Sequence, residues 1–146
     1  MRKLGALVGA VGTAVLLGGC GGGGGDVAAQ SPKAAWTAKH GPAIAALNAD
    51  LQTARTTLSS LQRNDILSNC NELRDSLNEA KKALPVPDPT SNDNLRTALD
   101  AVSVGTEDCV AGARGPDIPQ LERSFRELRE AATLMDVANR TIENWT

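Results

Sequence analysis

The chain has 146 residues, of which 41% are hydrophobic and 22% are charged, with a net charge of −2, two tryptophans, one phenylalanine and no tyrosine. This length allows one domain of ordinary size. The near-neutral charge excludes a basic nucleic-acid-binding protein, and the few aromatic side chains argue against a surface on which bases or sugars stack. One histidine and three cysteines supply little material for catalysis or metal binding.

Residues 1–19 are predicted to be a signal peptide that is cleaved from the chain. A positive start, Met1-Arg2-Lys3, precedes an uncharged apolar run of 14 residues from Leu4 to Leu17. This run suits a signal peptide and is shorter than the ~20 residues that span a membrane. Its end, Leu17-Gly18-Gly19-Cys20, resembles the lipobox of bacterial lipoproteins. The resemblance implies that Cys20 carries the lipid, including palmitate, on the extracytoplasmic face of the cell membrane. The alternative is an ordinary secretory signal with an unrelated cysteine.

Residues 20–31 are predicted to be the lipidated cysteine and a flexible tether, and residues 32–146 the folded domain. Ten of the 14 glycines lie in the first 25 residues, and five of them, Gly21–Gly25, follow Cys20 directly. Loss of residues 1–19 leaves 13 basic and 17 acidic side chains, a net charge of −4. An acidic domain is not attracted to anionic lipid headgroups, so the acyl chains must supply the attachment.

Apolar residues that recur every three or four positions predict four amphipathic helices in the domain. Strand-type alternation does not occur over a useful length. The fourth stripe carries the polar Asn139 in one of its apolar positions. The four stripes are Ile44, Leu47, Leu51, Ala54, Leu58 and Leu61; Ile66, Cys70, Leu73, Leu77, Ala80 and Leu84; Leu95, Ala98, Leu99, Val102 and Cys109; and Ile118, Leu121, Phe125, Leu128, Ala132, Met135 and Ile142.

Helix-breaking residues divide the first half of the domain at the same places. Ser31-Pro32 predicts an N-cap followed by proline at the first helical position. His40-Gly41-Pro42 predicts a kink or an interruption in the first helix, because proline cannot donate to the i−4 carbonyl. Asn64-Asp65 is suited to start the second helix. The stretch Pro85-Val86-Pro87-Asp88-Pro89 predicts a stiff connector that is not helical.

The second half of the domain contains similar breaks. Gly112 and Gly115-Pro116 are expected to end the third helix, and Asp117 with Gln120 predicts a capping box at the start of the fourth. Four helices of roughly 20 residues joined by short loops predict an all-α fold, an antiparallel up-down four-helix bundle.

Cys70 and Cys109 are predicted to form a disulfide between the second and third helices. Cys70 lies 14 residues before Leu84, and Cys109 lies 14 residues after Leu95. In an antiparallel hairpin both cysteines therefore rise ~21 Å from the same turn, on facing stripes. An exported chain meets the oxidising conditions in which disulfides form. The alternative is two buried free thiols.

Several polar and aromatic residues invite functional interpretations with simpler structural alternatives. His40 is expected to be a surface residue at the helix break rather than a metal or haem ligand. Trp36 and Trp145 are expected to close one end of the core rather than to face a ligand. Asn139 either sets the register of the fourth helix or lies near an open end.

The charged residues are expected to form solvated helix faces. Glu122–Arg126 and Arg126–Glu130 have the i,i+4 spacing of weak ion pairs. Asp88 and the pair Glu107-Asp108 are conceivable acid–base groups, but no nucleophile, histidine or oxyanion loop accompanies them in the sequence. We therefore predict that the protein is not an enzyme and has no catalytic residues, metal site or cofactor.

A tryptophan, paired helix cysteines and a proline-rich middle loop make the region Trp36–Ile142 similar to small helical envelope lipoproteins of actinobacteria. That resemblance implies a location and no activity. The sequence predicts a lipid-anchored envelope protein with a non-catalytic interaction module, an envelope protein partner of unknown identity and no nucleic-acid partner. The ligand-binding residues stay unknown. Two alternatives are a carrier that holds a small apolar ligand between the helices, favoured by an apolar cavity above roughly 300 Å³, and a prophage-type lipoprotein that interferes with infection.

Overall fold

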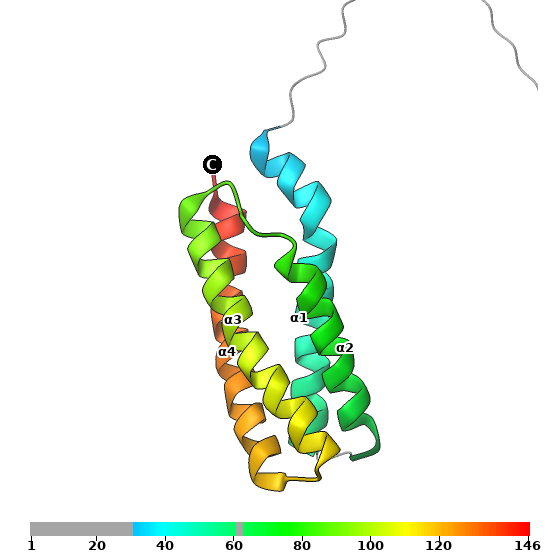
Figure 1. Ribbon diagram of the computed structural model, residues 1–146. Coiled ribbons are helices and arrows are strands. Elements are labelled where there is room, and N and C mark those ends of the chain that lie inside the picture. Colours follow the sequence, from blue (N-terminus) through cyan, green and yellow to red (C-terminus); the bar gives the residue numbers. More distant parts are fainter. Residues whose placement is uncertain (1–30, 61–62) are drawn as a thin grey trace, which may run out of the picture.

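The computed structural model describes residues 31–60 and 63–146, and in these ranges the chain forms four helices (Figure 1). They are α1 (Pro32–Ser60), α2 (Arg63–Lys81), α3 (Pro89–Arg114) and α4 (Ile118–Asn144). Each helix runs antiparallel to the next, and α4 returns to α1, so that the four form a closed ring. The predicted antiparallel four-helix bundle is confirmed. The signal peptide, Cys20 and Gly21–Gly25 lie outside the described residues.

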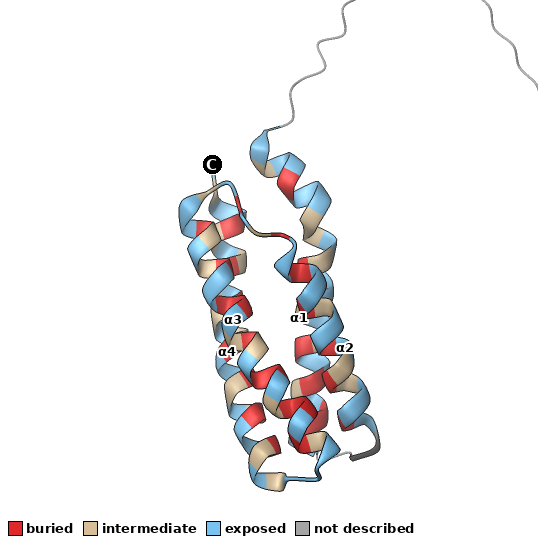
Figure 2. Ribbon diagram, in the orientation of Figure 1, coloured by how far each residue is buried: buried red, intermediate tan, exposed pale blue. Residues whose placement is uncertain are grey.

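The predicted stripes of α1, α2 and α3 form the core of the bundle (Figure 2). Leu84 is half-buried, and Leu61 lies outside the described residues. Because each stripe repeats every three or four residues, it keeps one face of its helix toward the other three along the whole length. The stripe residues of these helices that are buried are Ile44, Leu47, Leu51, Ala54, Leu58, Ile66, Cys70, Leu73, Leu77, Ala80, Leu95, Ala98, Leu99, Val102 and Cys109.

The inward face of α4 differs from the predicted stripe. Phe125, Ala132 and Asn139 are only half-buried. Small residues one position earlier take the core positions instead, namely Ser124, Ala131 and Ala138, each 0% exposed. They alternate with the correctly predicted Leu121, Leu128, Met135 and Ile142.

Small residues bring α3 and α4 together more closely than the other helix pairs. On α3, Ser91, Ala98, Gly105 and Gly112 recur every seven residues, and all are buried. On α4, Ser124 donates its hydroxyl hydrogen to the Gly105 carbonyl at 2.7 Å, so the two backbones are separated by little more than one hydrogen bond. A small residue at every second turn permits this approach, because a larger side chain would push the helices apart.

Side-chain caps begin three of the helices; those at Ser31 and Asp117 were predicted, and the one at Asp88 was not. The Ser31 hydroxyl accepts from the Ala34 amide at 3.2 Å, Asp88 accepts from the Ser91 amide at 2.8 Å, and Asp117 accepts from the Gln120 amide at 3.1 Å. These acceptors satisfy amides that have no partner within the first turn of a helix. Only half of the predicted capping box at Asp117 forms, because the Gln120 side chain donates across the bundle to Asp108 of α3 at 3.0 Å.

Three predicted helix boundaries were wrong, and of the kink or interruption predicted at His40-Gly41-Pro42, the interruption is absent. The first helix is not interrupted at Pro42, and α1 continues to Ser60. Proline removes the donor to the Ala38 carbonyl, but both residues are exposed, so water can replace it. Pro89 is the first residue of α3 rather than part of the connector, Gly112 lies within α3, and α2 begins at Arg63. Gly115 does cap the end of α3.

The predicted disulfide is confirmed. Cys70 of α2 and Cys109 of α3 are bonded, with their Cα atoms 5.7 Å apart, and both are almost completely buried. The bond joins the hairpin formed by α1 and α2 to the hairpin formed by α3 and α4. The edge of the bundle between α2 and α3 is therefore held covalently as well as by the loop between them.

Candidate functional site

The edge between α1 and α4 is the least closely packed of the four. Three surface depressions follow one another along it, and we call this edge the α1–α4 seam. The first, near the start of α1, has a volume of about 250 Å³, the middle one about 320 Å³ and the third, near the end of α1, about 330 Å³. The first and the middle depression share Asn48 and Asn139 in their linings. The seam therefore offers a hollowed surface on both sides of the bundle's midpoint.

The three depressions differ in chemistry. The first contains Trp36, Ile44 and Ile142 beside polar groups, and the third is mainly apolar, with Leu58, Leu121 and Phe125. The middle depression has an apolar floor and polar walls. Leu51, Ala132 and Met135 supply the floor, whereas Asn48, Gln52 and Arg55 of α1 and Asp136 and Asn139 of α4 supply the polar groups.

The polar residues that α1 contributes to the seam were not predicted from the sequence as candidate site residues. Asn48, Gln52, Arg55 and Ser59 follow the spacing of a helix face, one position after the core residues Leu47, Leu51, Ala54 and Leu58. This second stripe was visible in the sequence. Whether this stripe faces solvent or lines a site depends on which helix lies beside that flank of α1. The stripe itself does not specify which helix that is.

The histidine and the tryptophans lie near the end of the bundle where α1 begins. Trp36 is buried, and its indole N–H donates to the Ala83 carbonyl at 2.9 Å, while Trp145 packs half-buried against the core. Both therefore close the core as expected. The half-buried His40 ring lies 5.5 Å from the Trp36 ring. Partial burial, with a smaller contribution from Lys39, lowers the pKa of His40.

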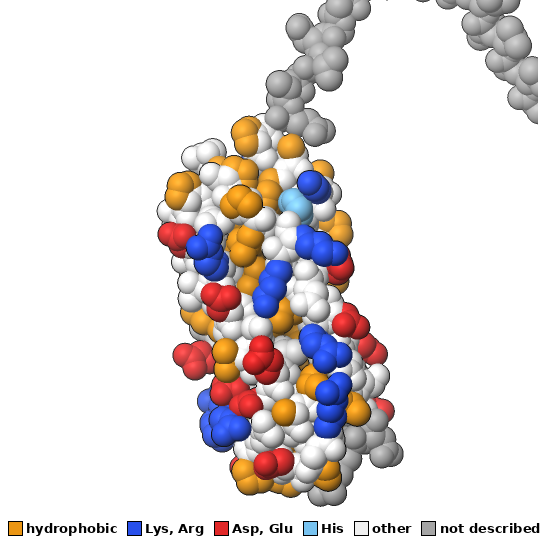
Figure 3. Space-filling view, viewed as in Figure 1, with side chains coloured by type: hydrophobic (Ala, Val, Ile, Leu, Met, Phe, Trp, Pro, Cys, Tyr) orange, Lys and Arg blue, Asp and Glu red, His pale blue; other side chains and the backbone are white. Residues whose placement is uncertain are grey.

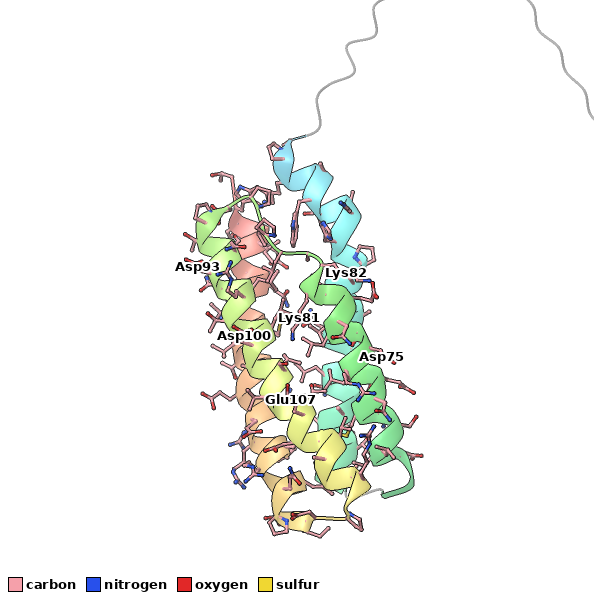
Figure 4. All side chains as sticks on the ribbon, viewed as in Figure 1. Asp75, Lys81, Lys82, Asp93, Asp100 and Glu107 are labelled. Carbon is pink, nitrogen blue, oxygen red and sulfur yellow. A yellow bond between two sulfur atoms is a disulfide. The ribbon has the colours of Figure 1, made fainter. Side chains whose placement is uncertain are left out.

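The structure does not bring the candidate acid–base residues together. Asp88 caps the start of α3, where the hydrogen bonds from Ser91 lower its pKa. Asp108 lies about 30 Å further along the same helix, at 1.5 Å per residue. Glu107 is exposed on the outer face of α3, in line with Asp93 and Asp100 (Figure 4). These residues accordingly form no shared site.

Asp108 belongs instead to a charged cluster between α3 and α4. Arg123 pairs with it, and the hydrogen bonds from Arg123 and Gln120 lower the pKa of Asp108. The adjacent Glu127 has a raised pKa, first because of burial and then because of the Asp108 charge. One Glu127 carboxylate oxygen, Oε2, is buried without a hydrogen-bond partner.

The predicted ion pairs along α4 were wrong. Neither Glu122–Arg126 nor Arg126–Glu130 forms among the described residues, whose salt bridges are Asp108–Arg123 and Glu79–Lys82. Long exposed side chains gain little from such pairs and lose rotamer freedom when they form. On the face formed by α2 and α3, acidic and basic side chains are likewise intermixed (Figure 3), and there Lys81 donates to Ser103 at 3.2 Å.

Within residues 31–60 and 63–146, no group of three or more His, Cys, Asp or Glu side chains is arranged to hold a metal ion. None of the helices in these ranges is long and apolar enough to cross a membrane. Among known proteins, no family model, curated protein or solved structure matches this chain. The candidate site therefore rests on the geometry of the α1–α4 seam.

Proposed function

We propose that the protein is a lipid-anchored component of the bacterial cell envelope that presents a non-catalytic helical binding module outside the cytoplasmic membrane. The observation that carries the binding module is the hollowed α1–α4 seam, an edge lined by apolar and hydrogen-bonding side chains together. Protein-binding and ligand-binding surfaces share this combination, in which apolar contacts supply affinity and a few polar groups supply orientation. The anchor is supported by the lipobox-like end of the predicted signal peptide at Cys20.

The direction of the bundle supports its presentation from a membrane. Helix α1 begins at Pro32, twelve residues after Cys20, and runs for 29 residues, about 43 Å at 1.5 Å per residue. The chain thus enters the bundle at the end where α4 finishes (Figure 1). A lipid at Cys20 would hold that end toward the membrane, and the loop between α3 and α4 at the other end would project outward. The seam runs between the two ends and would be accessible from the side.

The anchor is tested by replacing Cys20. We expect Cys20→Ala to move the protein from the membrane fraction into the soluble fraction, or to leave an unprocessed precursor, because the thiol that forms the thioether is absent. Cys70→Ala with Cys109→Ala is the matched control, since it removes two cysteines and leaves the anchor. Unchanged membrane partitioning of Cys20→Ala would contradict the lipoprotein proposal.

The binding module is tested in the native envelope. A photo-crosslinking residue placed at Asn48 in the seam should yield a discrete crosslinked product, whereas the same residue at the exposed Asp100 of α3 should not. Equal crosslinking from both positions, or from neither, would contradict a binding surface at the seam.

The carrier of an apolar ligand is favoured by one observation. The depression beside Leu58, Leu121 and Phe125 has a volume of about 330 Å³, which is large enough to hold a small ligand. It opens on the surface rather than inside the bundle. An apolar fluorescent probe should then bind, and Phe125→Ser should weaken that binding. The prophage-type role has no structural observation in its favour.

A further inference from the structure

Arg55 is a charged residue of the α1–α4 seam with a buried donor group. It is half-buried, and its Nε atom is buried without a hydrogen-bond partner. Its Nη1 atom makes only a long contact of 3.4 Å with the Gln52 side-chain oxygen. No carboxylate among the described residues forms an ion pair with it. A buried N–H group without a hydrogen-bond partner is costly, and native proteins usually supply that partner from the chain, from water or from a ligand.

The surroundings of Arg55 contain a carboxylate that does not pair with it. Asp136 of α4 lines the same middle depression of about 320 Å³, so a positive and a negative group face one space from different helices. Three side-chain amides, from Asn48, Gln52 and Asn139, lie along the walls. Each amide both donates and accepts hydrogen bonds, as a peptide group does.

We propose that the middle depression binds a zwitterionic ligand of the size of a short peptide. Its carboxylate would pair with Arg55, its ammonium group with Asp136, and its peptide group with the amides of Asn48, Gln52 and Asn139. An apolar side chain would rest on the floor of Leu51, Ala132 and Met135. This inference rests on the proposed function only in that it uses the same seam.

The charge pattern favours a zwitterion over a simple anion. A phosphate would gain from Arg55 and be repelled by Asp136, whereas a zwitterion gains from both. Arginine can also hold a carboxylate through two N–H groups at once, and a rotation of the Arg55 side chain would bring its Nε–H group out to take part. The volume is at the lower end of the range for ligand sites, which suits a dipeptide or a tripeptide.

The proposal is tested by NMR titration of the full chain in detergent micelles with the dipeptide Ala-Ala. We expect saturable shifts of the Arg55 Nε–H signal and of the side-chain amide signals of Asn48, Gln52 and Asn139. A dipeptide blocked at both ends should bind at least about tenfold more weakly, as should acetate and inorganic phosphate, because one charge-assisted hydrogen bond contributes about that factor.

Two variants and a control complete the test. Arg55→Gln and Asp136→Asn should each weaken binding of Ala-Ala at least about tenfold, whereas Arg96→Gln, at an exposed position on α3, should leave it unchanged. The absence of saturable shifts, equal binding of the blocked dipeptide or of acetate, or full binding by Arg55→Gln would each overturn the proposal. Membrane partitioning and crosslinking from Asn48 do not depend on this ligand, so they can succeed where it fails.

Discussion

Gly105 is the position where the close packing of α3 against α4 can be tested most directly. A Cβ atom at Gly105 would lie 2.7 Å from Cδ2, 2.8 Å from Cγ and 3.1 Å from the backbone nitrogen of Leu128. Leu128 is 0% exposed, so its side chain has no empty space into which to move. Gly105→Ala therefore forces the two helices apart or distorts Leu128.

Two effects of Gly105→Ala oppose each other. Alanine in a helix interior is more favourable than glycine by about 1 kcal/mol. Overpacking of a well-packed core costs about 1–3 kcal/mol, and the nearest atoms at Gly105 include backbone as well as side chain. We therefore expect a net loss of up to about 2 kcal/mol in the free energy of unfolding, which lowers Tm by up to roughly 8 °C in a domain of this size.

The assay is urea and thermal unfolding followed by circular dichroism at 222 nm. Gly41→Ala is the matched control, because its Cβ would meet only the Thr37 methyl carbon at an ordinary 3.6 Å, and it should stabilise the protein by up to about 1 kcal/mol. In a Leu128→Ala background most of the cost of Gly105→Ala should disappear, since the two nearest atoms, Cδ2 and Cγ of Leu128, are gone and only the backbone nitrogen at 3.1 Å remains. Stabilisation by Gly105→Ala, or the same cost in both backgrounds, would refute the argument.

Two further predictions concern the disulfide and the charged cluster. Reduction of Cys70–Cys109, which closes a 39-residue interval, should lower the free energy of unfolding by about 4 kcal/mol in urea titrations; an unchanged midpoint, or a Cys70→Ala/Cys109→Ala variant that still responds to reductant, would contradict this. The raised pKa of Glu127 favours the folded state below the carboxyl's unfolded pKa, and this contribution is lost as the pH rises through the folded value. Glu127→Gln should therefore gain stability relative to the native chain between about pH 4 and pH 7, and a relative loss across that range in pH-dependent unfolding would contradict it.

The helices and the disulfide were predictable because both depend on spacing within the chain. Apolar residues spaced three and four positions apart over five or six turns indicate an amphipathic helix. The positions of Cys70 and Cys109 relative to their common turn follow from helix rise alone. These features need no knowledge of the surface on which a helix packs.

The inward face of α4 was not predictable in the same way. Two overlapping stripes share Leu121, Leu128, Met135 and Ile142, and they differ only in whether Phe125, Ala132 and Asn139 or Ser124, Ala131 and Ala138 complete them. The larger residues look more like core. The smaller residues face α3, because Gly105 and Gly112 let the two backbones approach so closely that a phenylalanine side chain would not fit between them.

The candidate site was hidden for a related reason. Asn48, Gln52 and Arg55 are polar residues on a helix flank, a pattern usually explained by solvent. They acquire another meaning because that flank lies beside α4 across a hollowed edge. Arg123 illustrates the same limit, since it pairs with Asp108 of α3 rather than with a neighbour on its own helix.

The position of the seam follows from how the ring of helices is closed. The α1–α2 edge has a loop, the α2–α3 edge has a loop and the Cys70–Cys109 bond, and the α3–α4 edge has a loop and the close contact at Gly105 and Gly112. The α1–α4 edge has no loop, because its helices are the first and the last of the bundle. It is held by side-chain packing and by contacts such as that of Lys33 with the Glu143 carbonyl. Opening this edge to admit a ligand therefore breaks no covalent connection and leaves the tightest helix pair intact. A binding site at the seam accordingly lowers the stability of the fold less than one at any other edge of the bundle.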